Sequence, residues 1–192
     1  MDFSDSMLDR DSRNFYMVYT SNRGAYEEMP GGLTKSGTVK GYHGTLEGVN
    51  INQKLRKHEP LFNAEQQVIN RMDGKMEQTK YPVALDREVN DEYFYTVGVE
   101  YDSANPLELV GKTFTDLGFV STSYKPNKQK NTEYNFFGGR PVFMIIRVPI
   151  GTRAMLTDNT EHEVTLARGL TYKIVAVTID RNGVPVLTVD IV

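Results

Sequence analysis

Residues 172–191, YKIVAVTIDRNGVPVLTVDI, give the clearest indication of the fold. Two runs rich in β-branched residues flank Arg181-Asn182-Gly183, and Asn-Gly between such runs is a strong signal for a β-hairpin. Further short apolar runs that fit strands lie at 82–89, 118–123, 142–149 and 164–166. The second half of the chain therefore predicts a mostly antiparallel β core.

The chain before residue 81 has a different pattern. Between Val49 and Met76, apolar residues recur at helical spacing among polar ones. Pro60 divides this stretch into two predicted helices, about 49–58 and 63–77. Asn63 is the expected N-cap of the second helix, with Gln66 at the capping-box position. Together with the strands, this predicts an α+β fold.

The length and the texture of the sequence predict a single domain over residues 1–192. The polar start and the glycine-rich stretch that follows it predict that residues 1–48 are weakly ordered or irregular. Residues 49–80 are expected to be helical and residues 81–192 to form the β core.

Composition excludes several classes of function. The net charge of −3 argues against a general binder of nucleic acids or anionic membranes. The absence of Cys excludes disulfides, thiolate metal sites and Cys nucleophiles. His43, His58 and His162 do not have the spacing of a zinc site. The N-terminus lacks the features of a secretory signal, and no apolar stretch could span a bilayer, so we expect a soluble protein that acts in a cytosol.

Three polar motifs follow one another along the predicted strands. Arg87 lies in the 82–89 run, Ser121-Thr122-Ser123 closes another strand, and Glu161 and Glu163 are two residues apart where a strand begins. In an extended chain, residues at this spacing point to the same face. Each motif alone is more often a salt-bridging arginine, an ordinary strand end or a solvated acidic surface. Their joint presence and their order carry the functional argument.

Taken together, the motifs resemble the arginine–Ser-Thr-Ser–Glu-x-Glu class of mono-ADP-ribosyltransferase toxins, which includes the clostridial actin-modifying binary toxins and related exoenzymes. The resemblance runs in order from about residue 50 to residue 180. Beyond the three motifs, it rests on Ile51-Asn52-Gln53-Lys54-Leu55-Arg56, Gly118-Phe119-Val120, Pro149-Ile150-Gly151-Thr152, Arg168-Gly169 and Tyr172-Lys173-Ile174. It implies helices packed on a mostly antiparallel, two-sheet β core of the ADP-ribosyltransferase type.

The resemblance also implies the reaction. The enzyme would cleave the nicotinamide–ribose bond of NAD⁺, its co-substrate, and would need no metal. Glu163 would stabilise the oxocarbenium-like centre that forms. Arg87 would bind the pyrophosphate through its guanidinium. Ser121 would orient Glu163 and the nicotinamide-side ribose, with Thr122 and Ser123 supporting the strand end.

Further cofactor contacts are implied on three other segments. The backbone of Glu88 would hold the nicotinamide amide, although relatives often have glycine there. In the loop 125–140, Phe137 would cover nicotinamide and Arg140 would reach a phosphate. Asn52 and Arg56 would contact the nucleotide from their helix. The alternative for these residues is ordinary packing in the core or on a helix face.

Glu161 implies the acceptor. In relatives, an acid two residues before the catalytic glutamate accompanies arginine acceptors, because a carboxylate can attract a guanidinium and take its proton. The implied partner is a protein with a reactive arginine, and the resemblance also allows a separate delivery component. Two alternatives stay open at this stage: an NAD⁺ glycohydrolase, which would use nearly the same residues, and an inactive binding or structural module of the same fold.

Overall fold

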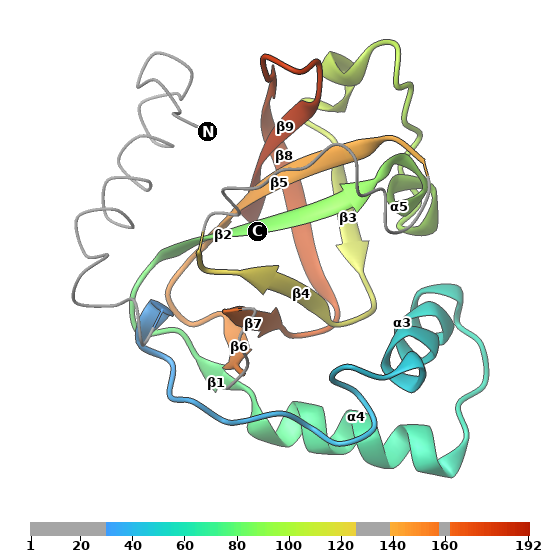
Figure 1. Ribbon diagram of the computed structural model, residues 1–192, viewed down its shortest axis with the longest axis vertical. Coiled ribbons are helices and arrows are strands. Elements are labelled where there is room, and N and C mark those ends of the chain that lie inside the picture. The colour runs from blue at the N-terminus through green and yellow to red at the C-terminus, as the bar shows by residue number, and fades with distance from the viewer. Residues whose placement is uncertain (1–29, 126–138, 158–161) are drawn as a thin grey trace.

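The computed structural model describes residues 30–125, 139–157 and 162–192 (Figure 1). The helices in these ranges are η2 (Pro30–Gly32), α3 (Leu46–Lys57), α4 (Asn63–Lys75), α5 (Asp91–Thr96) and η3 (Pro106–Leu109). The strands are β1 (Glu77–Gln78), β2 (Val83–Asn90), β3 (Thr113–Asp116), β4 (Val120–Ser123), β5 (Pro141–Val148), β6 (Arg153–Leu156), β7 (Glu163–Leu166), β8 (Leu170–Ile179) and β9 (Pro185–Ile191).

The described strands form one nine-stranded sheet in the order β1-β6-β7-β4-β2-β5-β9-β8-β3. Only the β5–β9 pair is parallel; the other neighbouring pairs are antiparallel. The α+β class and the mostly antiparallel core are therefore confirmed. The expected division into two sheets is not confirmed, because β4 is hydrogen-bonded to β2.

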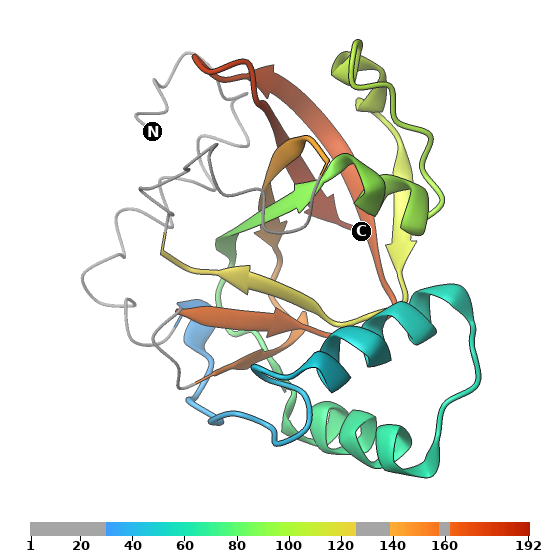
Figure 2. The same cartoon turned by 45° about the vertical axis from the view of Figure 1, so that its right-hand side comes forward.

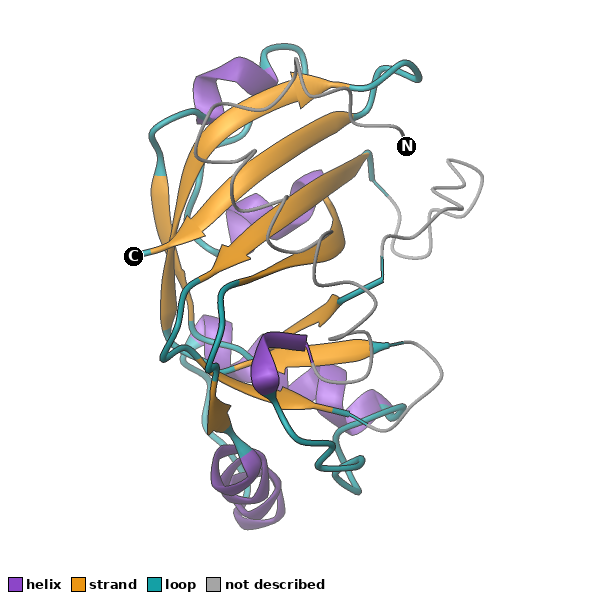
Figure 3. Ribbon diagram, turned by 90° about the vertical axis from the view of Figure 1, so that its left-hand side faces the viewer, coloured by secondary structure: helices purple, strands orange, loops and turns teal. Residues whose placement is uncertain are grey.

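The β2–β4 connection is nevertheless narrow. It consists of the single pair Asp86–Ser123, whereas β2 pairs with β5 along its whole length. Figure 3 shows the strands as two groups, one above the other, which correspond to β2-β5-β9-β8-β3 and β1-β6-β7-β4 in Figure 1. The fold therefore brings two blocks of strands together at one residue pair.

Helices α3 and α4 pack beside the β4-β6-β7 block (Figure 2). Apolar residues of both helices share a cluster with Phe119 and Met155. Helix α3 begins three residues earlier than predicted because the Thr45 hydroxyl accepts a hydrogen bond from the Gly48 N–H and caps it. It ends before His58, which adopts the left-handed conformation with φ 55°.

The N-terminus of α4 differs from the prediction by one residue. Phe62 is the N-cap, and its backbone N–H donates to the Glu65 carboxylate over 2.8 Å. The predicted cap at Asn63 with Gln66 was therefore wrong, because Glu65 supplies the acidic side chain at the third helical position. Pro60 lies in the connection between the two helices, as the sequence predicts.

Helix α5 was not predicted. It directly follows β2, and the Asn90 side chain caps it by accepting from the Tyr93 N–H over 3.1 Å. The sequence contains a pattern typical of a helix N-terminus at Asn90-Asp91-Glu92, a cap residue followed by two acids in the first turn. This helix buries Tyr93 and Phe94 against the β core and so brings an aromatic ring close to Arg87.

The hairpin that indicated the fold is confirmed. The Asp180 N–H donates to the Val184 carbonyl over 2.9 Å between β8 and β9, and Gly183 has φ 78°. Side chains of β2, β5, β8 and β9 fill the largest hydrophobic cluster, with Leu85, Ile146 and Leu187 fully buried. Across the three described ranges, no helix combines the length and the apolar character that crossing a bilayer requires.

Candidate active site

The three motifs meet where the two strand blocks join. Ser123 of β4 pairs with Asp86 of β2 on one side and with Glu163 of β7 on the other. Arg87 follows Asp86, and its Nη1 donates to the Ser121 carbonyl oxygen over 2.6 Å. Residues from three distant parts of the chain are thus held side by side by strand pairing.

Glu163 is a largely buried carboxylate at the start of β7, with 9% of the residue exposed. Its Oε1 accepts from the Thr165 hydroxyl at 3.2 Å, and its Oε2 accepts from the Thr157 hydroxyl at 3.3 Å. The Nε2 atom of His43 lies 4.0 Å from the same Oε2. The two hydroxyls fix the direction of the carboxylate without neutralising its charge.

Arg87 places a guanidinium over the Tyr93 ring, 5.2 Å from its centroid. Its Nε is buried and has no hydrogen-bond partner among the described residues. A buried donor without a partner is costly, so the position of this guanidinium calls for a functional explanation. A guanidinium provides a planar set of donors that matches a phosphate or carboxylate.

Asp116, at the end of β3, organises the surroundings of Arg87 and was missed by the sequence analysis. It is fully buried and accepts from Arg56 Nε (2.8 Å) and Nη2 (3.0 Å), from Tyr93 Oη (2.8 Å) and from the Gly118 N–H (2.8 Å). Burial, with this carboxylate nearby, raises the pKa of Tyr93 well above its ordinary value, so that Tyr93 remains a hydroxyl donor. The network connects α3, α5 and the β3–β4 turn.

The two predicted nucleotide contacts on α3 already have protein partners. The Asn52 amide donates to Tyr42 Oη and accepts from the Phe119 N–H, both over 2.9 Å. The Arg56 guanidinium is paired with Asp116, and its side chain is 12% exposed. The structure therefore shows both residues holding the start of β4, while their contact with a nucleotide stays a prediction.

Gly118 gives Asn52 and Arg56 the space that this arrangement uses. A Cβ atom at this position would lie 3.0 Å from Asn52 Oδ1 and 3.2 Å from Arg56 Cζ. A larger residue would require the Asn52 and Arg56 side chains to shift from these positions. The glycine of the motif thus allows close packing.

The other predicted residues on β2 and β4 occupy different environments. The buried Thr122 hydroxyl donates to the Val164 carbonyl over 2.6 Å, and the Ser123 hydroxyl donates to the Lys125 carbonyl over 3.0 Å. Ser121 is exposed on β4. Glu88 is exposed on β2, where it pairs with Phe143 of β5. Thr122 and Ser123 thus anchor the strand end, while Ser121 is accessible.

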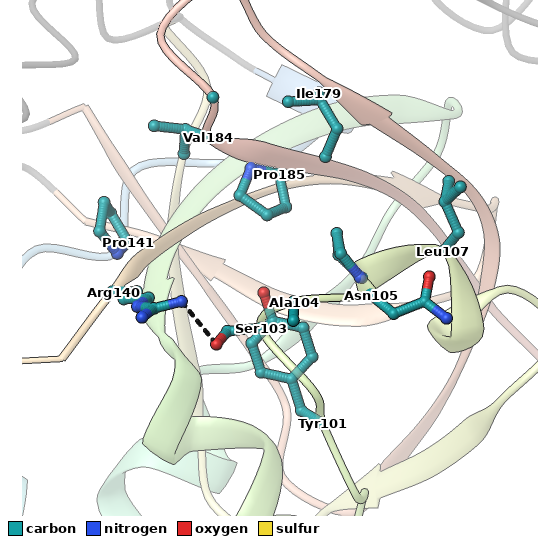
Figure 4. Close-up of a pocket in the computed structure, with 12 residues that line it drawn as sticks. Tyr101, Ser103, Ala104, Asn105, Leu107, Arg140, Pro141, Ile179, Val184 and Pro185 are labelled. Atoms are coloured by element: carbon teal, nitrogen blue, oxygen red, sulfur yellow. Dashed lines mark hydrogen bonds between the residues drawn. The ribbon is translucent and has the colours of Figure 1, made fainter.

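Arg140 lines a pocket together with residues of other segments of the chain (Figure 4). Its Nη1 donates to the Ser103 hydroxyl over 2.7 Å. The pocket has a volume of about 500 Å³, and Tyr101, Leu107 and Pro185 are among the residues that line it. The proposed reach of Arg140 to a phosphate stays a prediction. Phe137, its proposed companion, lies outside the described residues.

The backbone turns sharply just before Glu163. His162 has φ 55°, so the extended geometry assumed between Glu161 and Glu163 was wrong at the intervening residue. Tyr124 stabilises this turn: its N–H donates to the His162 carbonyl over 3.1 Å, and its hydroxyl lies 3.3 Å from His162 Nδ1. Glu161 lies outside the described residues. In the parts of the chain that are described, no group of three His, Asp or Glu side chains could hold a metal ion.

Comparison with known proteins identifies the fold independently. The C3 exoenzyme of Clostridium limosum is 20% identical, with a TM-score of 0.63 over 91% of this chain and 94% of that chain. C3stau2 from S. aureus, solved with NAD, is 18% identical, with a TM-score of 0.60 over 79% and 84% of the two chains. The enzymatic component C2-I of the Clostridium botulinum C2 toxin is 17% identical, with a TM-score of 0.59, and the match covers 100% of this chain and 49% of that chain.

At these identities the solved structures show the fold alone. A search of curated proteins finds no match. The model of the ADP-ribosyltransferase exoenzyme family matches residues 33–191, which include the three motifs and the strands that bring them together. The chain therefore belongs to the ADP-ribosyltransferase exoenzyme family.

Proposed function

We propose that the protein transfers ADP-ribose from NAD⁺ to an arginine side chain of another protein. The observation that carries the proposal is the meeting of Arg87, β4 and Glu163 at the one pair that joins the strand blocks. Family membership supports the transfer of ADP-ribose, and a solved relative, C3stau2, contains NAD.

The residues at this junction suit cleavage of the nicotinamide–ribose bond. The leaving group is a cationic pyridinium that departs as neutral nicotinamide, so no acid is needed to expel it. The ribose carbon develops positive charge, which a fixed carboxylate stabilises. Glu163 has this role in the proposal, with Thr157 and Thr165 holding its two oxygens. Arg87 binds the pyrophosphate through its guanidinium.

The acceptor follows from Glu161. A guanidinium nitrogen of the target forms the new bond to the ribose carbon and loses a proton. A carboxylate at position 161 attracts the cationic target and accepts that proton, which an amide could not do. This assignment rests on the Glu-x-Glu spacing of the sequence.

A separate delivery component is part of the proposal. C2-I is the enzymatic component of the C2 toxin, and BECa of C. perfringens belongs to a binary enterotoxin. This chain aligns with about half of each of these two proteins, since the matches cover 49% and 48% of their lengths. We propose that the protein acts in the cytosol of a target cell after such delivery.

The test uses labelled NAD⁺ with agmatine, a small guanidino acceptor, and follows both free nicotinamide and ADP-ribosyl-agmatine. The wild type should form both products. Glu161→Gln should lose transfer to agmatine but keep hydrolysis of NAD⁺. Glu59→Gln, at an exposed glutamate between α3 and α4, is the matched control and should behave as the wild type.

Three results would change the conclusion. Release of free ADP-ribose without any agmatine product would identify a glycohydrolase. A calorimetric titration that shows no NAD⁺ binding would indicate a binding or structural module instead. Equal loss of transfer and hydrolysis in Glu161→Gln would mean that Glu161 holds NAD⁺ rather than the acceptor.

A further inference from the structure

His43 lies beside the proposed catalytic carboxylate although it belongs to none of the sequence motifs. It is part of the turn before α3, and its Nε2 lies 4.0 Å from Glu163 Oε2. The two side chains are 5% and 11% exposed, so bulk water screens their interaction poorly. The imidazole is thus placed to affect the charge of the site.

The hydrogen bonds of His43 define its proton positions. The Val39 N–H donates to His43 Nδ1 over 2.8 Å, which makes Nδ1 an acceptor. The neutral ring therefore carries its hydrogen on Nε2, the atom that faces Glu163. This buried Nε2 has no hydrogen-bond partner within the described ranges. A second proton would have to bind Nδ1 and would displace the Val39 N–H.

Burial, rather than the charges around the ring, favours the neutral form of His43 at pH 7. Burial lowers the pKa of His43 below its ordinary value, and Lys75 on α4 acts in the same direction, while the Glu163 carboxylate opposes them. The Tyr42 ring packs edge-on against the imidazole, with centroids 4.9 Å apart. Burial raises the pKa of Tyr42 to about 12, so this neighbour remains uncharged.

We propose that His43 is a positioning residue for Glu163, active as a neutral imidazole that directs its Nε2–H toward the carboxylate and inhibitory when protonated. The proposal rests on the catalytic role proposed for Glu163. A protonated His43 would form an ion pair with Glu163 and cancel the negative charge that the developing ribose cation requires. It would also release the turn at residues 39–43, because the Val39 N–H would lose its acceptor.

The first test measures the contact without relying on catalysis. The three histidines are titrated by NMR in the wild type and in Glu163→Gln, and the His43 signal is assigned by its loss in His43→Gln. Removing the carboxylate should lower the pKa of His43, because the negative charge of Glu163 favours the protonated ring. An unchanged pKa of His43 in Glu163→Gln would overturn the proposal.

The second test measures the pH dependence of nicotinamide release. In the wild type, kcat should fall on the acid side, by up to about tenfold per pH unit once His43 becomes protonated, with KM for NAD⁺ changing less. His43→Gln keeps an amide donor at this position but cannot gain a proton. The kcat of this variant should therefore not show the acid-side fall, even if its kcat at neutral pH differs from that of the wild type. His58→Asn, where Asn tolerates the left-handed backbone, is the control and should keep the wild-type profile.

The two proposals can fail separately. If His43→Gln keeps the acid fall of the wild type, His43 does not control Glu163. If the wild type releases no nicotinamide, the proposed function is contradicted, and the NMR titration still decides whether His43 and Glu163 interact.

Discussion

Asp116 and Glu163 are both buried carboxylates in the same β core, but their surroundings differ. Asp116 accepts two hydrogen bonds from Arg56 and one each from Tyr93 and Gly118, all between 2.8 and 3.0 Å. Glu163 accepts from two threonine hydroxyls at 3.2 and 3.3 Å, and a histidine lies 4.0 Å away. Asp116 is thus paired with a cation, whereas the contacts of Glu163 within the described ranges include two neutral hydroxyls.

The difference separates a structural acid from a functional one. A carboxylate paired with a buried guanidinium and two further donors is saturated, and it contributes to the folded structure. A carboxylate fixed by hydroxyls keeps negative charge that can act on a ligand. The same comparison applies to the arginines: Arg56 is committed to Asp116, whereas the buried Nε of Arg87 lacks a partner among the described residues.

Asp116→Asn should give the largest effect on stability. It would leave the Arg56 guanidinium, 12% exposed, without a charged partner, and losing one member of a buried ion pair costs about 3–5 kcal/mol. Urea unfolding monitored by circular dichroism measures this. The matched control is Asp73→Asn, which removes the more exposed pair with Arg168 (2.9 Å) and should cost at most about 1 kcal/mol. Equal losses in the two variants would remove the distinction between Asp116 and a surface acid.

Glu163→Gln should affect activity strongly and stability little, in contrast to Asp116→Asn. The amide keeps the shape of the side chain but removes the charge, so kcat for nicotinamide release should fall by at least about 10²-fold, as when one fixed electrostatic group is removed from an active site. Its unfolding free energy should change less than that of Asp116→Asn. Retained hydrolysis of NAD⁺ in the folded variant would contradict the role of Glu163.

The comparison also explains what the sequence could reveal. The strands, the Asn182-Gly183 hairpin and the order of the three motifs follow from local patterns and from the resemblance, and the structure brings Arg87, β4 and Glu163 together. The Asp116 network could not be predicted, because its partners lie on α3 and α5, 60 and 23 residues away in the chain. Pairing over such distances depends on tertiary packing rather than on local periodicity.

His43 was missed for a similar reason. It lies in a turn outside every motif, and only the tertiary fold brings its Nε2 to within 4.0 Å of Glu163 Oε2. Helix α5 is a different case, since Asn90 as a cap and the two acids after it are a local sequence pattern that predicts the start of a helix. That helix should have been expected, and with it an aromatic residue close to Arg87.

Tyr93→Phe tests whether the hydrogen-bond network of Asp116 controls the position of Arg87. It removes the hydroxyl that donates to Asp116 over 2.8 Å but keeps the ring beneath Arg87. We expect a loss of about 1.5–3 kcal/mol in unfolding free energy, the usual range for a hydrogen bond to a charged group, and little change in KM for NAD⁺. Tyr93→Leu also removes the ring and should weaken NAD⁺ binding by on the order of 1 kcal/mol, measured by calorimetry. If Tyr93→Phe weakened binding as much as Tyr93→Leu, the hydroxyl network rather than the ring would orient Arg87.

The smallest expected effect concerns the stability of the Glu163 region as the pH falls. The pKa of His43 is lowered in the folded protein, chiefly by burial, so below about pH 6.5 the unfolded chain binds a proton that the folded chain does not. The stabilisation that His43 provides is therefore complete above that pH and is lost as the pH falls toward the lowered pKa.

We expect the difference in unfolding free energy between wild type and His43→Gln to decrease from pH 7 to pH 5, as measured by urea unfolding at each pH. Because the two proteins differ only at residue 43, this difference isolates His43. A difference that stayed constant with pH would show that the pKa of His43 is the same in the folded and unfolded states. The folded turn would then not favour the neutral imidazole over the protonated one.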